Sequence, residues 1–216
     1  MTAQHQRIVK VCGMRDADNI RQVEALGIQW MGFIFCPQSS RHCAALPAYL
    51  PQHCRRIGVF VDATLNDIMD RQQAFRLDGI QLHGHETPKF CRQLRSASAA
   101  AIIIKMIPVA TADDMQQTAD YAPYVDYFLF ETKLPAPTNG INGGSGVQFD
   151  WDILAHYHGT TPFLLTGGIT PDDAPRLRAI RHPQFAGIDL NSKFESSPGI
   201  KDVALLRHFL HHLHEH

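Results

Sequence analysis

Short apolar runs alternate along the chain with stretches in which apolar residues recur at helical spacing. The runs are nearly continuous and rich in Val, Ile and Phe, which is typical of parallel strands buried on both faces. The pattern predicts eight strands, at Ile8–Met14, Trp30–Phe35, Arg56–Val61, Gly79–Leu82, Ile102–Ile107, Tyr127–Glu131, Phe163–Thr166 and Phe185–Leu190.

Helical segments follow most of these strands, and several begin with a capping residue or with a proline in the first turn. They are predicted at Asp16–Leu26, Thr64–Phe75, Thr87–Arg95, Pro171–Ile180 and Asp202–Leu213. Prolines interrupt the connection from Phe35 to Arg55, and the segment from Val109 to Tyr127 also lacks a clear helical pattern.

Eight strand–helix units in 216 residues favour an α/β fold, a single-domain (β/α)8 TIM barrel that spans residues 1–216. The alternative is an open doubly wound sheet, which favours a glycine-rich fingerprint after the first strand. The turn Cys12-Gly13-Met14-Arg15 does not have that fingerprint. The proline-rich, polar segment Lys133–Asn142 is predicted to form a mobile loop above the barrel mouth.

Composition narrows the class of protein further. The formal net charge of -1 provides no basic field for nucleic acid, and no apolar run is long enough to cross a membrane. The N-terminus lacks the basic and apolar regions of a secretory signal, and the five cysteines form no CxxC pair. We therefore expect a cytoplasmic protein with free thiols. The histidine-rich tail is consistent with a last helix whose histidines face solvent, with adventitious metal binding as the alternative.

Residues at the carboxyl ends of the predicted strands are the candidates for chemistry, because ligands of parallel barrels bind there. They are Cys12, Gln81, His83, Glu131, Asp189 and the loop Pro37–Arg41. A thiol acts as a base where a nearby cation favours the thiolate, and Lys10 lies on the same side of its strand as Cys12. The alternative for Cys12 is a small buried hydrophobe. Glu131 directly follows an apolar strand, where a carboxylate requires a specific role.

A phosphate site is predicted at the ends of the last two strands. Gly167 and Gly168 precede a helix and let backbone N–H groups approach an anion, and Ser192 and Lys193 follow the neighbouring strand. The alternative is that the two glycines only make a tight turn. No metal-ligand spacing and no cofactor motif occur in these loops. A thiol, a carboxylate and a phosphate site together suit proton transfer on a phosphorylated small molecule.

Nine short motifs that follow one another along nearly the whole chain resemble the phosphoribosylanthranilate isomerase family of tryptophan biosynthesis. They are Lys10–Met14, Gly32–Phe35, Pro37–Arg41, Ile57–Val61, Gln81–Gly84, Gly143–Gly146 with Phe149–Trp151, Leu165–Ile169, Asp189 and Glu195–Asp202. The resemblance implies an Amadori rearrangement without a cofactor. In this reaction a general acid protonates the furanose ring oxygen, a general base removes the proton at ribose carbon 2, and the enolamine relaxes to the ketone.

The resemblance also implies roles for individual residues. Cys12 matches the base, and Glu131 occupies the position of the acid, which is an aspartate in the family. Arg41 matches the residue that grips the anthranilate carboxylate, a task that suits a guanidinium group. The phosphate is expected at Gly167, Gly168, Ser192 and Lys193, and the rest of the substrate at Gln81, His83 and Asp189.

Three departures from the family pattern stand out. Glu131 moves the carboxyl group by about 1.5 Å relative to an aspartate, which costs rate if nothing compensates. The loop Lys133–Asn142 is longer than usual, and Asn191-Ser192-Lys193 replaces the more usual Ser-Ser-Gly.

Two alternative functions stay open. The related histidine-pathway isomerase typically has an aspartate at the first strand end and a half-barrel repeat, whereas this chain has Cys12 and no such repeat. A non-catalytic barrel that binds a phosphorylated metabolite is the other alternative. We expect a monomer, since a barrel needs no partner to complete its core.

Overall fold

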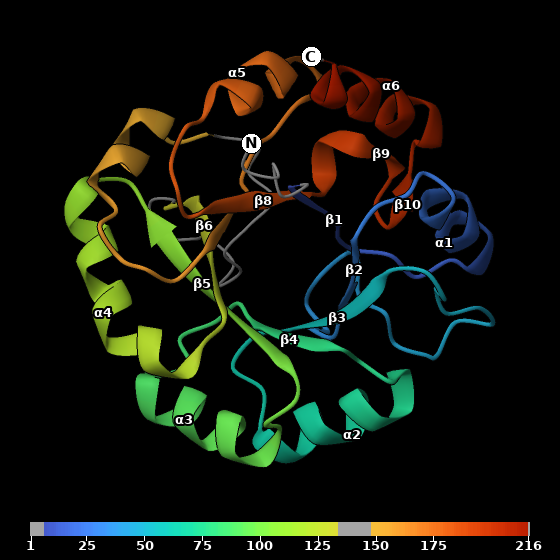
Figure 1. Cartoon of the computed structure of the whole chain (residues 1–216). Coiled ribbons are helices and arrows are strands. Elements are labelled where there is room, and N and C mark those ends of the chain that lie inside the picture. The colour runs from blue at the N-terminus through green and yellow to red at the C-terminus, as the bar shows by residue number, and fades with distance from the viewer. Residues whose placement is uncertain (1–6, 134–147, 216) are drawn as a thin grey trace.

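Eight parallel strands pair in chain order and close into a barrel in the computed structural model, which describes residues 7–133 and 148–215 (Figure 1). The first strand pairs with the second on one side and with the eighth on the other, so the predicted TIM barrel is confirmed. The strands are β1 Ile8–Val11, β2 Trp30–Ile34, β3 Arg55–Phe60, β4 Gly79–Leu82, β5 Ile102–Val109, β6 Tyr127–Thr132, β7 Phe163–Leu165 and β8 Phe185–Leu190.

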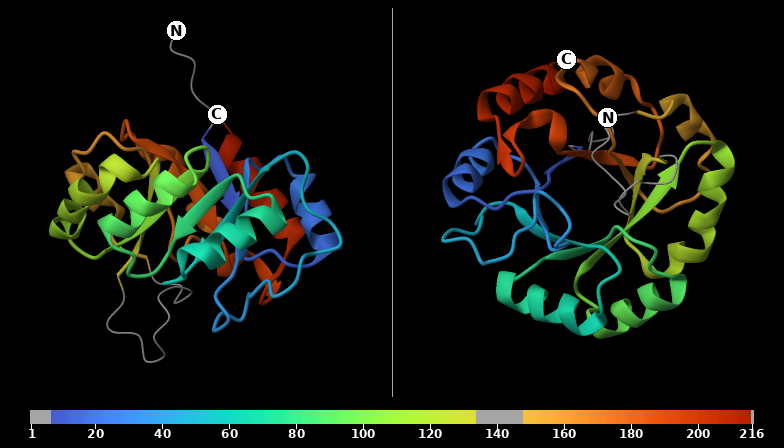
Figure 2. Two further views of the ribbon diagram at one scale, coloured as in Figure 1. Left: turned by 90° about the horizontal axis from the view of Figure 1, so that it is seen from below. Right: turned by 180° about the vertical axis from the view of Figure 1, so that it is seen from behind.

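Helices surround the strands as an outer ring, which is visible from both ends of the barrel (Figures 1 and 2). The α-helices are α1 Ala17–Glu24, α2 Leu65–Phe75, α3 Pro88–Ala97, α4 Thr118–Tyr121, α5 Ala174–Ala179 and α6 Val203–His214. Short 3₁₀ helices complete the ring at η1 Ala112–Gln117, η2 Ala122–Tyr124, η3 Trp151–His156, η4 Pro171–Asp173 and η5 Ser192–Phe194. A small antiparallel pair, β9 Glu195–Ser197 and β10 Ile200–Lys201, follows η5.

The helix starts follow from local sequence. Asp16, Thr64 and Thr87 each accept a hydrogen bond from a backbone N–H in the first turn of α1, α2 and α3, as their capping side chains predict. The segment between β2 and β3 contains no helix, in agreement with its prolines. The predicted helix at Pro171–Ile180 is divided into η4 and α5.

Six of the eight strands differ from the prediction by one to three residues at an end, whereas Gly79–Leu82 and Phe185–Leu190 match it at both ends. The largest difference is at β1, which ends at Val11 and not at Met14, so Cys12 lies just beyond the strand, where the chain already turns toward the next element. The predicted mobile loop Lys133–Asn142 lies outside the described residues from its second residue onward.

The interior of the barrel sets the direction of the site. An inner cluster of Trp30, Ile57, Ile104, Met106, Leu129 and Leu164 fills the barrel, and a larger outer cluster packs the strands against the helices. Side chains of a strand alternate between these two sides, with a period of two residues. The side chains of β6 that face the barrel interior therefore include Leu129 and then Glu131. On β1 the interior-facing side chains include Lys10 and, just beyond the strand, Cys12. Polar side chains thus replace apolar ones at the carboxyl ends of the strands.

No helix among residues 7–133 and 148–215 is long and apolar enough to cross a membrane. Within the same residues, no group of three or more His, Cys, Asp or Glu side chains is arranged to hold a metal ion. The histidines of α6 instead contact one another and Glu215, whose carboxylate lies 3.0 Å from Nδ1 of His212 and 3.3 Å from Nε2 of His211.

Candidate active site

The thiol of Cys12 lies in a buried, charged environment at the end of β1. Nζ of Lys10 is 2.7 Å from Oδ2 of Asp189, and the β1–β8 register places these two residues opposite each other. A Cβ atom at Gly32 of β2 would lie 2.7 Å from Sγ of Cys12 and 3.1 Å from Nζ of Lys10. Both side chains therefore fill the space that this glycine leaves, and Lys10 contacts the thiol as well as Asp189.

Opposing effects act on the pKa of the Cys12 thiol. Burial raises the pKa most strongly, while the positive charges of Lys10 and Lys201 act to lower it, and the net shift is upward. Burial also acts to lower the pKa of Lys10, but the Asp189 carboxylate reverses this effect and keeps the ammonium group charged. The site therefore holds a protonated thiol beside fixed cations that favour the thiolate.

Glu131 enters the same barrel mouth from the end of β6. Its Oε2 atom lies 3.0 Å from Nε2 of His83, which follows β4, and the Glu131 side chain is mostly buried. Nδ1 of His83 is 3.0 Å from the amide nitrogen of Gln81, the preceding inward residue of β4. Asp189 interacts electrostatically with Lys10 on one side of the site and with His83 and Glu131 on the other. Burial and Glu131 act to raise the pKa of Asp189, whereas Lys10 and His83 act to lower it.

Three acceptor oxygens around this mouth lack an aligned hydrogen-bond donor among the described residues. Oε1 of Gln81, Oε2 of Glu131 and Oδ1 of Asp189 are buried and lack an aligned hydrogen bond to a residue in the described part of the chain. Unpaired buried oxygens are costly, which makes them sites for donors such as hydroxyl or N–H groups of a ligand.

A second charged cluster surrounds Arg41, which the sequence predicted to grip a carboxylate. Nε and Nη2 of Arg41 donate to both carboxylate oxygens of Glu195, at 2.7 to 2.9 Å. Nζ of Lys201 lies 2.7 Å from Oε1 of Glu195 and 2.7 Å from Oδ1 of Asn191. One edge of the guanidinium group is thus occupied, and Nη1 has no hydrogen bond to any described residue.

The glycine turn after β7 lies directly beside the carboxylate of β6. Gly167 has a φ of 89°, and a Cβ atom there would lie 3.0 Å from the backbone nitrogen of Thr132 and 3.4 Å from Cγ of Glu131. Only glycine adopts this backbone and leaves this space at low cost. Gly168 follows, and Ser192 and Lys193 lie in η5 after the adjacent strand β8, with Lys193 exposed.

A closed parallel barrel with a thiol, a carboxyl group and buried cations at its carboxyl rim defines a barrel enzyme of the general acid–base type. The family described as N-(5'phosphoribosyl)anthranilate (PRA) isomerase matches residues 9–212. The chain belongs to this family.

Individual relatives agree with this assignment. N-(5'-phosphoribosyl)anthranilate isomerase from Phocaeicola vulgatus is 47% identical over 206 residues, covering 95% of this chain and 97% of the relative. The enzyme from Parabacteroides distasonis is 46% identical and covers 94% and 91%, respectively. Among solved structures, phosphoribosyl anthranilate isomerase from Thermus thermophilus superimposes with a TM-score of 0.78 at 26% identity, covering 95% of this chain and 98% of that chain.

The sequence interpretation did not include Glu195 and Lys201 among the site residues. Both belong to the last of the nine motifs, so a signal was present. Charged residues in a loop are usually solvated, however, and nothing in the sequence indicates that Lys201 is buried or that its cation acts on Cys12.

Proposed function

We propose that this barrel catalyses the Amadori rearrangement of N-(5'-phosphoribosyl)anthranilate in tryptophan biosynthesis, with Cys12 as general base and Glu131 as general acid. The observation that carries the proposal is that a candidate base and a candidate acid lie at the same rim of the barrel. A thiol lies beside the buried cation Lys10 on β1, a carboxyl group lies at the end of β6, and Asp189 interacts with both sides.

The reaction needs one proton donor and one proton acceptor. Glu131 gives its proton to the furanose ring oxygen, and the C–O bond breaks as the nitrogen lone pair forms the Schiff base. The Cys12 thiolate then takes the proton from ribose carbon 2, and the electron pair moves into the enolamine. Ketonisation returns one proton to carbon 1 and removes one from the carbon 2 hydroxyl, so the overall change is an isomerisation. Lys10 stabilises the thiolate.

The remaining candidates bind the substrate. Nη1 of Arg41 is available to the anthranilate carboxylate, while Glu195 holds the other edge of the guanidinium group. The phosphate group lies at Gly167, Gly168, Ser192 and Lys193. The buried oxygens of Gln81 and Asp189 accept hydrogen bonds from substrate hydroxyl or N–H groups, and His83 lines the same pocket.

We propose further that residues 1–216 form one domain that acts as a monomer, and that the protein is cytoplasmic. A closed barrel presents no unpaired strand edge for a second copy. All five cysteines are free, which suits a reducing compartment.

The test is a fluorescence assay that follows the consumption of freshly made phosphoribosylanthranilate by the parent and by the Cys12→Ala and Glu131→Ala variants. We expect activity in the parent and a loss of at least about 10²-fold in kcat in each variant, the usual contribution of a general acid or base. Inactivity of a folded parent would instead support the non-catalytic barrel. Activity that persists in either variant would remove that residue from the mechanism.

A further inference from the structure

The carboxyl group of Glu131 ends beside the ring of His83. The two side chains are 11% and 15% exposed, and Nε2 of His83 lies 3.0 Å from Oε2 of Glu131. This oxygen is buried and has no aligned hydrogen bond to any residue of the described ranges. A buried carboxylate oxygen is costly without a donor, and the His83 ring brings a nitrogen within hydrogen-bond distance. Such contacts commonly align only when substrate is bound.

Gln81 determines which nitrogen of His83 carries the proton. Nε2 of Gln81 lies 3.0 Å from Nδ1 of His83, and the Gln81 side chain is buried. An amide nitrogen only donates, so Nδ1 is the acceptor in this pair. A neutral His83 then carries its proton on Nε2, the atom that faces Glu131. Gln81 belongs to β4 and His83 directly follows the end of that strand, two residues further along, so the short backbone between them fixes the two side chains relative to each other.

We propose that His83, oriented by Gln81, is a positioning residue that aims the Glu131 carboxyl group at the substrate. The inference rests on the proposed role of Glu131 as the acid. Oε2 accepts from the His83 N–H, and Oε1 carries the proton that is delivered. When the Oε1–H bond breaks and the new O–H bond forms on the ring oxygen, Glu131 becomes a carboxylate. The His83 N–H interacts more strongly with that anion than with the neutral acid, so it favours the transfer.

The contact gives the longer glutamate side chain a defined position. Gly167 leaves room on one side, because a Cβ atom there would lie 3.4 Å from Cγ of Glu131. At the far end of the Glu131 side chain, the His83 ring lies beside Oε2 and limits the movement of the carboxyl group. Asp189 is the further charged group that acts on this pair, and it is held by Lys10. A glutamate has one more rotatable bond than an aspartate, so an uncontrolled carboxyl group would spend less time in the productive orientation.

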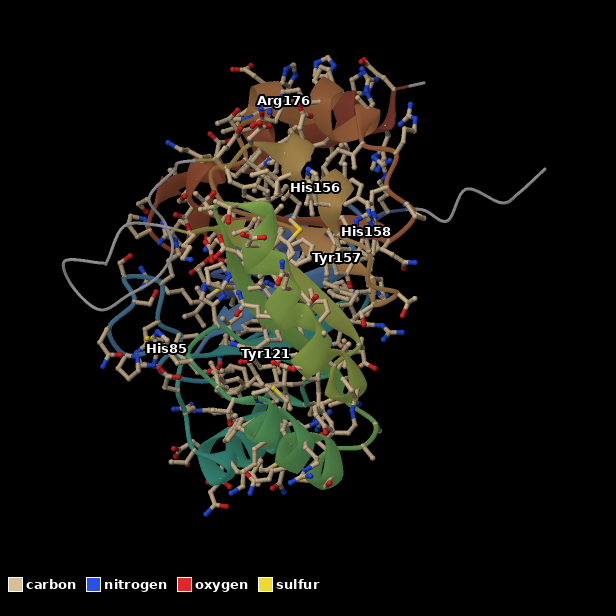
Figure 3. The ribbon with its side chains drawn as sticks, turned by 90° about the vertical axis from the view of Figure 1, so that its left-hand side faces the viewer. His85, Tyr121, His156, Tyr157, His158 and Arg176 are labelled. Carbon is tan, nitrogen blue, oxygen red and sulfur yellow. The ribbon has the colours of Figure 1, made fainter. Side chains whose placement is uncertain are left out.

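The test compares His83→Ala, His83→Gln and His85→Ala in steady-state kinetics. We expect His83→Ala to lower kcat by about 10²-fold with little change in KM, the cost of a catalytic group displaced by about 1 Å. His83→Gln keeps an N–H near the position of Nε2 and should recover most of the rate. His85 is a matched control: its side chain is 79% exposed, it pairs with Asp62, and it lies at the periphery in Figure 3. Its removal should leave kcat within about twofold of the parent.

A double-mutant cycle with Glu131→Ala isolates the proposed coupling. If His83 acts through Glu131, His83→Ala should cost almost nothing further in the Glu131→Ala background. Equal losses in both backgrounds, or a rise in KM with unchanged kcat, would overturn the proposal. So would a Glu131→Asp variant that equals or exceeds the parent, because its carboxyl group would be withdrawn from His83. Full activity of Glu131→Ala would contradict the proposed acid itself, and this result is distinguishable from a failure at His83 alone.

A spectroscopic measurement tests the same arrangement without turnover. In the ¹⁵N spectrum of the parent, we expect the His83 ring to show a protonated Nε2 and an acceptor Nδ1. Gln81→Leu should remove this preference while the control signals of His85 stay in place. A parent in which Nδ1 carries the proton would overturn the proposed orientation by Gln81.

Discussion

At the residue scale, the chemistry depends on how the charges around Cys12 balance. Three cations, Lys10, Lys201 and Arg41, face two carboxylates, Asp189 and Glu195. The cluster therefore carries one unmatched positive charge before Cys12 ionises. The positive charges of Lys10 and Lys201 therefore favour the thiolate of Cys12, although burial outweighs them and raises the pKa of the thiol.

Lys10→Met should move the pH dependence of kcat/KM. The Lys10 charge opposes the upward effect of burial on the Cys12 pKa, so its removal raises that pKa further. Less thiolate is then present at a given pH, and the ascending limb of the profile should move to higher pH. A thiol pKa that is higher by one lowers the rate about tenfold at any pH on that limb. Lys89→Met removes an exposed lysine on α3 and should leave the profile unchanged.

Because Lys10→Met leaves Asp189 buried without its partner, the Lys10→Met/Asp189→Asn double variant is the companion that removes both buried charges together. If the ascending limb of the pH profile of kcat/KM stays at the same pH in both variants, Lys10 does not act on the pKa of the thiol.

At the scale of elements, the β9–β10 hairpin supplies a charged layer that closes one side of the mouth. It lies between α1 and α6 in Figure 1, and β10 contacts α1. Nδ2 of Asn19 in α1 donates to the carbonyl of Lys201, and the Lys201 N–H donates back to Asn19. The hairpin is therefore anchored to a neighbouring helix, and it holds Glu195 between Arg41 and Lys201.

Glu195→Ala should destabilise the protein strongly. The substitution leaves the buried Lys201 and the partly exposed Arg41 without their shared carboxylate, and breaking a buried pair in this way typically costs about 3–5 kcal/mol. Asp18→Ala removes an exposed pair with Arg21 and should cost less than about 1 kcal/mol. Urea unfolding of both variants measures the difference. Similar midpoints for the two would show that the Glu195 cluster adds no more than a surface pair.

The same carboxylate gives stability a defined pH dependence. Burial alone would raise the pKa of Glu195, but Arg41 and Lys201 hold it below its ordinary value. The stabilisation is therefore present above the ordinary glutamate pKa of about 4.3 and is lost as pH falls through the lower pKa of the folded state. The gap in stability between the parent and Glu195→Ala should narrow over that range.

At the scale of the whole molecule, the barrel exists only because β8 returns to β1. This seam is tight at Gly187, where a Cβ atom would lie 2.0 Å from the carbonyl oxygen of Ile8. The register pairs these two residues directly. A side chain at residue 187 would push β1 and β8 apart. Crowding at this one residue would therefore weaken the strand pairing that closes the barrel.

Gly187→Ala should lower the melting temperature more than Gly27→Ala. Overpacking at the seam costs about 1–3 kcal/mol or more, and each kcal/mol corresponds to about 2–4 °C in a chain of this length. Gly27 has open space around its Cβ position, so alanine there meets only the strain of a φ of 77°. Calorimetry distinguishes them, and equal melting temperatures would show that the seam accommodates a methyl group.

Local sequence determined the strands, most of the α-helices and the direction of the chemistry, but it did not indicate α4, which lies in the segment from Val109 to Tyr127 that lacks a clear helical pattern. Alternating apolar runs predicted all eight strands, and the capping residues Asp16, Thr64 and Thr87 predicted where three helices begin. These features depend on neighbours a few residues apart, so the chain encodes them directly. The motifs at the strand ends were sufficient to predict the family, which the comparisons confirm. The roles of the individual site residues stay predictions.

Only the tertiary structure decided which side chains meet. The Lys10–Asp189 pair joins residues 179 positions apart, and the Arg41–Glu195 pair joins residues 154 positions apart. The contact between His83 and Glu131 likewise joins the segment after β4 to β6, on the two sides of β5. Such contacts depend on closure, strand register and burial, none of which a linear spacing specifies. The sequence therefore determined the reacting groups, whereas the closed barrel determined their partners, because only folding sets the distances between strands remote in the chain.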